Sequence, residues 1–126
     1  MAINFQIDPE QQLVHLRMTG TLTNQDAFDL LAELRQHPDF KPHFKELADL
    51  RRLERNEVTG DALVQLARDS VYDTDVRRAI VVGNDTDYGL ARLYRLLAQN
   101  NPEVIELFWS MKEAREWLGL PPEDDK

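Results

Sequence analysis

Two segments near the N-terminus alternate strictly between apolar and polar residues. The pattern holds over Ile3–Ile7 and again over Val14–Met18, and such alternation is typical of a strand buried on one face. The residues Asp8, Pro9 and Glu10 between the two segments favour a turn. We therefore predict a β-hairpin at the N-terminus, with the polar side of both strands exposed to water.

The remainder of the chain alternates helical patterns with short apolar segments. Thr23, Thr59 and Ser110 each precede residues at helical spacing, so we expect them to be N-caps. The predicted helices run from Thr23 to before Pro38, from Thr59 through Ala67, from about Asp87 to Ala98, and from Ser110 to near Gly119. The predicted strands are Phe44–Leu50, Arg78–Val82 and Val104–Phe108, and a polar loop joins the first of these to Thr59.

This order of elements predicts an α/β fold. Strands that alternate with helices pair in parallel through right-handed crossovers, so we expect a mixed five-stranded sheet with a hairpin first and mostly parallel β-α repeats after it. About four helices would lie mainly on one face of that sheet, because the hairpin strands are polar on the other. We expect a single domain over residues 1–120 and an acidic, disordered tail over residues 121–126.

The composition narrows the classes of partner. The chain carries 15 Lys+Arg against 23 Asp+Glu, a formal net charge of −8. Such a field repels phosphate backbones, so we expect no nucleic-acid partner. The absence of cysteine excludes disulfides and thiolate metal sites. No apolar segment approaches the length of a membrane span and no secretory leader is visible, so we expect a cytoplasmic protein without an integral membrane segment.

Neither a metal site nor a catalytic constellation can be read from the sequence. His15, His37 and His43 lack acidic or cysteine residues at spacings that would complete a metal site. Ser70 and Ser110 lack the context of an activated nucleophile. We therefore expect no metal, no cofactor and no enzymatic activity.

The turn that leads into the helix ending at Ala98 resembles a ligand-binding turn only superficially. Asp85 and Asp87 place negative charge at the helix start, where it caps the helix and opposes a phosphate. We therefore expect no nucleotide site there. Gly89 shares a helical arc with Leu93, and we expect it to allow close packing of this helix on the sheet.

Three segments resemble a known family: "ADLRRLERNEVTGDALVQLA", "RRAIVVGNDTDYGLARLY" and "VIELFWSMKEAREWLG". They are similar to the SpoIIAA-like family, part of the STAS-like fold group (sulfate transporter and anti-sigma-factor antagonist), over about Ile3–Leu120. The most specific parts are Tyr88–Arg92, Glu113–Ala114 and Trp117–Leu118. The resemblance implies strands in near-sequential order and helices mainly on one side. Its bacterial members are small stand-alone cytoplasmic domains, mostly of unknown function.

The resemblance implies two kinds of activity. Anti-sigma-factor antagonists are regulatory protein-interaction modules, switched by phosphorylation of a Ser in an Asp-Ser-Ser-Gly-like motif after the third strand. The corresponding residues Asn56–Asp61 lack that motif, which leaves Thr59 as a distant stand-in for the phosphorylated residue. Other SpoIIAA-like proteins look built to carry an apolar ligand or lipid, or to contact a membrane peripherally, by moving helices off the sheet.

A polar stripe on the helix ending at Ala98 is the first candidate site. Tyr88, Arg92 and Arg95 lie on one side of that helix, and neither arginine has an acidic residue three or four positions away. In so acidic a chain, this absence suggests partners from elsewhere. One interpretation is an interaction face for another protein or for a second copy in a homodimer; the alternative is two solvated arginines, or bonds to acids of this chain such as Asp49.

The short helix after Thr59 supplies a second candidate. Its apolar arc is wider than a core stripe needs, and Val64 and Val71 lie at one shoulder. The helix is either wedged between two neighbours or exposes an apolar edge that completes the interaction face. In the carrier alternative, the helices at Thr59–Ala67 and Asp87–Ala98 form a lid over an apolar pocket. That pocket is lined by Leu63, Leu66, Leu90, Leu93 and Leu97.

Overall fold

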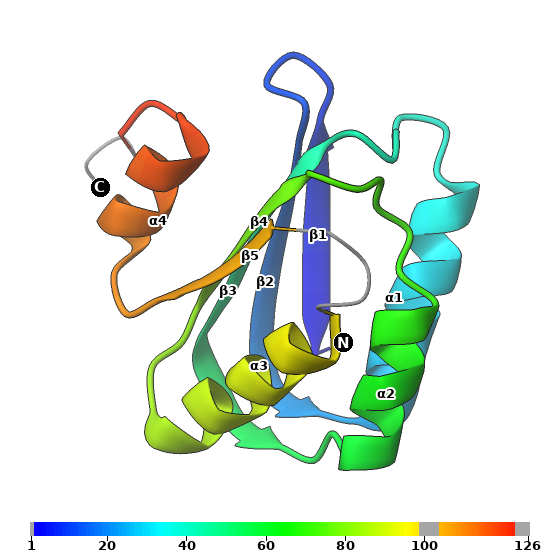
Figure 1. Cartoon of the computed structure of the whole chain (residues 1–126), viewed down its shortest axis with the longest axis vertical. Coiled ribbons are helices and arrows are strands. Elements are labelled where there is room, and N and C mark those ends of the chain that lie inside the picture. Colours follow the sequence, from blue (N-terminus) through cyan, green and yellow to red (C-terminus); the bar gives the residue numbers. More distant parts are fainter. Residues whose placement is uncertain (1, 99–103, 123–126) are drawn as a thin grey trace.

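The computed structural model describes residues 2–98 and 104–122 (Figure 1). Residues 123–126 of the predicted acidic tail lie outside the described residues. The elements are β1 (Ile3–Asp8), β2 (Leu13–Leu22), α1 (Asn24–Gln36), β3 (Lys45–Asn56), α2 (Gly60–Arg68), β4 (Arg77–Val81), α3 (Asp85–Leu97), β5 (Val104–Phe108) and α4 (Met111–Leu118).

The five strands form one mixed sheet in the order β1-β2-β3-β4-β5. β1 and β2 pair antiparallel, with Phe5 opposite Leu16. The pairs β2–β3, β3–β4 and β4–β5 are parallel. The predicted hairpin, the mostly parallel β-α repeats and the sequential strand order are therefore confirmed.

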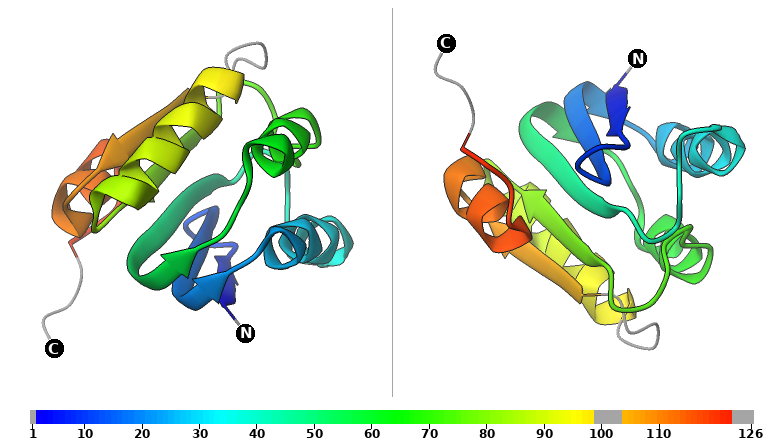
Figure 2. Two further views of the ribbon diagram at one scale, coloured as in Figure 1. Left: turned by 90° about the horizontal axis from the view of Figure 1, so that it is seen from below. Right: turned by 90° about the horizontal axis from the view of Figure 1, so that it is seen from above.

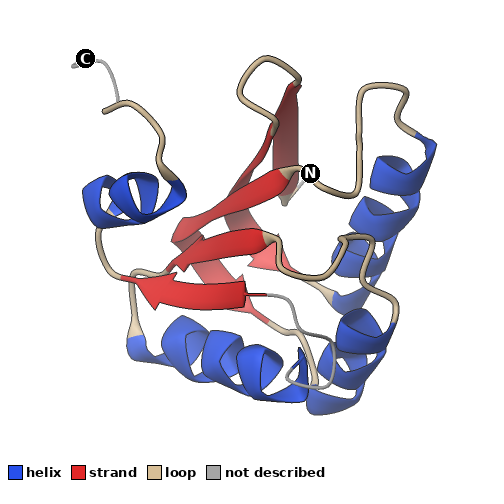
Figure 3. Cartoon of the chain, turned by 45° about the horizontal axis from the view of Figure 1, so that its top comes forward, coloured by secondary structure: helices blue, strands red, loops and turns tan. Residues whose placement is uncertain are grey.

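Three of the described helices cover one face of the sheet and the fourth lies on the other (Figure 2 and Figure 3). The larger apolar cluster joins the sheet to α1, α2 and α3, and includes Leu34, Leu63 and Ala91. A smaller cluster packs Met111 and Ala114 of α4 against β3 and β4. The polar pattern of the hairpin strands predicted that the second face would be exposed to water. This face is only partly hydrated, because α4 covers its centre.

β3 is longer than the sequence predicts. The predicted strand ended at Leu50, whereas the structure continues it to Asn56 beside the second half of β2. In this extension Leu53 is buried while the charged residues next to it are exposed. Apolar alternation is therefore missing, and backbone pairing with β2 maintains the strand instead.

The N-caps follow the predictions at three helices and differ at one. Thr23, Thr59 and Ser110 cap α1, α2 and α4 through their side-chain oxygens. At α3 the cap is Asn84, whose side chain accepts a hydrogen bond from the backbone N–H of Asp87 at 2.8 Å. The asparagine oxygen thereby satisfies one of the first backbone donors of the helix.

Candidate functional site

A mainly apolar cavity of about 130 Å³ lies between the sheet and α1, α2 and α3. Several lining residues are half-exposed, so the cavity lies close to the protein surface. Its apolar lining includes Leu16, Ala27, Leu30, Leu63, Leu66 and Leu90. These residues come from β2, α1, α2 and α3, so the site exists only where the three helices meet the sheet.

A buried ion pair contributes polar atoms to the cavity lining. Arg78 Nε donates to Glu46 Oε1 at 3.1 Å, and the Tyr72 hydroxyl donates to Glu46 Oε2 at 2.8 Å. Arg78 Nη1 donates to the Tyr94 hydroxyl at 3.1 Å. The guanidinium carbon of Arg78 lies 4.5 Å and 5.4 Å from the ring centroids of Tyr72 and Tyr94. Hydrogen bonds and ring faces together compensate two charges that are removed from water.

Strand register explains why these two charges point inward. Glu46 and Arg78 are direct partners across β3 and β4. Side chains alternate between the faces of a sheet, so Leu47 and Ala79 pack on the α4 side while their charged neighbours face α2 and α3. Burial, followed by the nearby Glu46 carboxylate, raises the pKa of Tyr72 well above its usual value. Tyr72 therefore remains a protonated donor to Glu46.

A second polar group lies at the other end of β3. Asp87 is 2% exposed and accepts hydrogen bonds from the Asn56 side chain at 3.1 Å and the Asn84 side chain at 3.0 Å. Asn56 and Asp87 also line the cavity. These hydrogen bonds fix the start of α3 against the end of β3. Together with Glu46 and Arg78, they place polar atoms near both ends of the part of β3 that borders the cavity.

The predicted pocket residues fall in different places. Leu63, Leu66 and Leu90 line the cavity. Leu97 packs against the main apolar cluster but does not contribute to the lining. Leu93 requires a correction, because its side chain is 38% exposed and α3 turns it away from the sheet.

Gly89 requires a correction for the same reason. It is exposed, as are Leu93 and Leu96, and a Cβ atom built on Gly89 would meet open space. Gly89 therefore does not mediate close packing of α3 on the sheet. The sequence pattern identified this arc correctly as apolar but assigned it to the wrong side of the helix.

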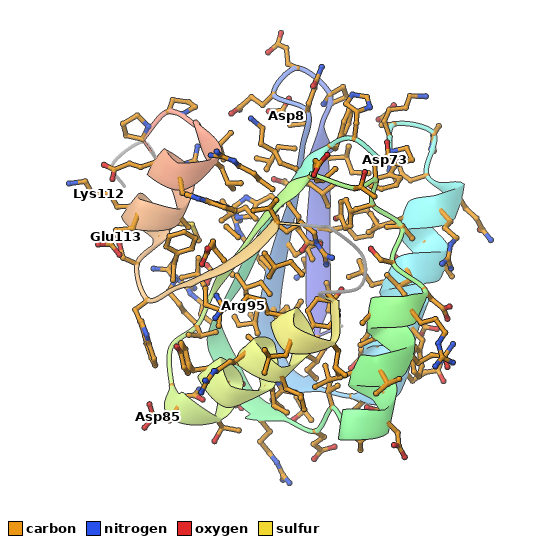
Figure 4. All side chains as sticks on the ribbon, in the orientation of Figure 1. Asp8, Asp73, Asp85, Arg95, Lys112 and Glu113 are labelled. Carbon is orange, nitrogen blue, oxygen red and sulfur yellow. The ribbon has the colours of Figure 1, made fainter. Side chains whose placement is uncertain are left out.

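The predicted polar stripe turns toward β5. Tyr88 stacks on Trp109 with ring centroids 5.5 Å apart and an interplanar angle of 18°. Arg95 Nη1 lies 3.2 Å from Glu106 Oε1 on β5, and Figure 4 shows Arg95 between α3 and that strand. Arg92 is exposed. Arg95 therefore has an intramolecular partner, whereas Arg92 and the aromatic pair face the surface.

Asp49 is not the partner of either stripe arginine. Its carboxylate accepts hydrogen bonds from the Arg51 side chain at 2.9 Å. Burial alone would raise the pKa of Asp49, but the hydrogen bonds and charge of Arg51 outweigh burial and lower it. The acid is therefore already paired within β3.

The remaining predicted residues lie on or beside α2. Val64 is 38% exposed on α2, whereas Val71 is half-buried against the main apolar cluster. They belong to a different segment from the stripe that faces β5. The Thr59 side chain is exposed and caps α2, and its hydroxyl oxygen also accepts a hydrogen bond from Asn24 at 3.2 Å.

Sequence reasoning missed the buried ion pair, although a signal was present. Arg78 begins a predicted strand whose next four residues, Ala79–Val82, are all apolar, a pattern typical of a strand buried on both faces. A buried arginine requires an acidic partner. The predicted neighbouring strand contains Glu46 and Asp49, so the sequence limits the acidic partner of Arg78 on that strand to these two residues.

The comparisons with known proteins establish the fold. No protein-family profile matches the chain, and no curated protein matches it. A solved structure of an uncharacterized protein from the DUF3478 family with a SpoIIAA-like fold, from Shewanella loihica PV-4, is 18% identical. The alignment covers 93% of this chain and 92% of that one, with a TM-score of 0.59. The fold is therefore SpoIIAA-like, as the sequence resemblance implied.

One structural property bears on membranes. Among residues 2–98 and 104–122, no helix is both long and apolar enough to span a bilayer.

Proposed function

We propose that this chain is a non-enzymatic cytoplasmic module that binds a small apolar molecule beneath α1, α2 and α3. The cavity supports this proposal. Protein cores are close-packed with few voids larger than a water molecule. The volume of about 130 Å³ is lined mainly by apolar side chains, and a bound apolar molecule would remove that lining from water.

The size of the cavity limits the ligand. An engineered apolar cavity of about 150 Å³ is known to bind benzene, and the cavity here is close to that size. A single ring or a short chain therefore suits this arrangement, whereas a long acyl chain would require α1 or α2 to move away from the sheet. The half-exposed lining residues Leu30 and Leu66 mark where a ligand would enter.

Binding without catalysis fits the polar groups at the site. A nucleophile needs an adjacent general base. Here Glu46 and Arg78 are bonded to each other, and Ser70 Oγ accepts a hydrogen bond from the backbone N–H of Tyr72. The polar atoms are arranged to hold one another and to orient a guest.

Native mass spectrometry of protein purified from cells tests the proposal. We expect an added mass that is released on denaturation. Ala27→Leu, which fills the cavity, should reduce the added mass, whereas Ala32→Leu on the exposed side of the same helix should leave it unchanged. A bare mass for the natural chain, or equal added mass in both variants, would contradict the proposal.

A second candidate function is supported by the stacked pair of half-buried Tyr88 and exposed Trp109. Trp109 is 51% exposed, stacks on Tyr88 and follows β5. Trp, Tyr and Arg dominate the binding energy of protein interfaces, and Arg92 lies one helical turn from Tyr88. We propose self-association through Tyr88, Trp109 and Arg92 as this alternative.

Sedimentation at increasing protein concentration tests the alternative. The natural chain should form dimers, and Trp109→Ala and Arg92→Ala should weaken them with little change in Tm. A monomer throughout the concentration range would contradict self-association without affecting the proposal for the cavity.

A further inference from the structure

We infer that this chain associates with a second copy of itself through the outer sides of two α3 helices, which run antiparallel about a two-fold axis. This inference rests on the proposed self-association through Tyr88, Trp109 and Arg92. It gives that association a geometry, and it adds Asp85 as the residue that pairs with Arg92 of the other copy.

The side of α3 that faces away from the sheet carries both charged and apolar groups. Residues there repeat at spacings of three and four positions, and they are Asp85, Gly89, Arg92 and Leu96, with Leu93 beside them. All five are exposed, and we call them the outer arc of α3. Leu93 and Leu96 are 38% and 49% exposed. Exposed apolar groups that gather among polar residues mark interaction sites.

Asp85 and Arg92 are the charged residues of the outer arc. Among residues 2–98 and 104–122, neither side chain takes part in a hydrogen bond or an ion pair, whereas Arg95 pairs with Glu106. Asp85 lies at the start of α3 on the outside of the molecule (Figure 4). Arg92 follows about two turns later, so the helix holds opposite charges about 10 Å apart along its axis.

This spacing of charges makes the outer arc complementary to itself in one orientation. When a second α3 lies antiparallel to the first, Asp85 of each copy faces Arg92 of the other, and one two-fold axis generates both pairs. A parallel arrangement would set like charges opposite each other, which is unfavourable at an interface. The charges of α3 therefore select the antiparallel arrangement.

The same arrangement brings the exposed apolar groups together. Trp109 stacks on Tyr88 near the start of α3, whereas Leu93 and Leu96 lie toward its end. In the antiparallel pair, the leucines of one copy extend toward the aromatic residues of the other. Gly89 lies near the axis, where it presents no side chain that would hold the two helices apart.

Reversal of the two charges, followed by sedimentation equilibrium, tests this geometry. Asp85→Arg and Arg92→Asp each replace two attractive contacts by two repulsive ones, so each should raise the dimer Kd at least about tenfold. An equimolar mixture of the two variant chains should associate again, because every contact then joins opposite charges. The double variant should likewise form dimers, with a Kd within about threefold of the natural value.

Exposed residues far along the chain from α3 provide matched controls. Glu33→Arg on α1 changes the net charge from −8 to −6, as Asp85→Arg does. It should leave the Kd unchanged or lower it, because two acidic copies then repel each other less. Pairing at Asp85 thus predicts the opposite sign from a general effect of charge. If Asp85→Arg fails to fold, Arg92→Asp is compared with Lys41→Asp, an exposed control with the same change of charge.

The outcomes separate the geometry from self-association as such. Dimers whose Kd responds no more to Asp85→Arg or Arg92→Asp than to the controls would overturn the inference and retain self-association through another surface. Failure of the mixed variants to associate would also overturn it. A natural chain that stays monomeric up to millimolar concentration would overturn both the inference and the proposed self-association, and it would leave the proposal for the cavity intact.

Discussion

Glu46 and Arg78 face each other across β3 and β4 inside the protein, with Glu46 Oε1 3.1 Å from Arg78 Nε. Their side chains are 5% and 8% exposed. Removal of either charge alone takes from the other its partner across β3 and β4. The change in the free energy of unfolding that a substitution at one residue causes therefore depends on whether the other residue is present.

A double-mutant cycle should show this dependence. Glu46→Met and Arg78→Met should each lower the free energy of unfolding by about 3–5 kcal/mol. The double variant should be more stable than either single variant, because neither residue of the pair is then left charged without the other. Urea denaturation measures all three. The exposed pair Arg95 and Glu106 is the control, where single substitutions should change stability by less than about 1 kcal/mol. Additive losses at the buried pair would show that the two charges are not coupled.

Stability should fall at alkaline pH because of Tyr72. Burial and the Glu46 carboxylate raise the pKa of Tyr72 in the folded protein, whereas an unfolded tyrosine ionises near pH 10. The protonated form therefore favours folding fully below about pH 10, and this stabilisation is lost as the pH rises toward the folded-state value. Unfolding measured between neutral pH and pH 11 should show the decline. Tyr72→Phe should flatten it, and Tyr88→Phe should not. Ionisation of Tyr72 near pH 10 in the native protein would refute this account.

Asp87 should matter far more than its neighbour Asp85. Asp87 is buried and accepts two side-chain hydrogen bonds, so Asp87→Ala should cost about 1–3 kcal/mol by leaving Asn56 without its acceptor. Asp85 is exposed in the same helical turn, and Asp85→Ala should cost less than about 1 kcal/mol through the helix dipole. Thermal unfolding compares the two variants. Equal losses would mean that the bond to Asn56 contributes little.

Two glycines should respond to alanine with opposite signs. A Cβ on Gly89 meets open space within α3, so Gly89→Ala should raise stability by about 0.5–1 kcal/mol. A Cβ on Gly83 would lie 3.2 Å from the backbone of Arg51. Gly83→Ala should therefore lower stability by forcing β3 and the turn between β4 and α3 apart. Destabilisation by both substitutions would indicate that Gly89 serves a packing role after all.

The strands of the sheet and their order could be predicted because they are determined by patterns within short segments of the sequence. Alternation over Ile3–Ile7 and Val14–Met18, capping residues and short apolar segments determine the elements and their order. The end of β3 could not be predicted in this way. Residues 51–56, which are mostly charged, pair with β2 through the backbone, and backbone hydrogen bonds can form whatever the side chains are.

The candidate site was less accessible from sequence because it depends on which side of a helix faces the sheet. Leu90 and Leu93 are equally apolar, yet one lines the cavity and the other is exposed. A wide apolar arc admits both orientations. Likewise, the partner of Arg78 depends on the register between β3 and β4, which brings Glu46 rather than Asp49 opposite it.

The central claim is that the space beneath α1, α2 and α3 accepts a small apolar molecule, and methyl NMR during a benzene titration tests it most directly. Saturable shifts should appear at Leu30, Leu63 and Leu66, persist in Ala32→Leu and disappear in Ala27→Leu. The free energy of unfolding should rise with benzene concentration as linkage requires. Shifts that fail to saturate, or that are the same in the two variants, would contradict the claim.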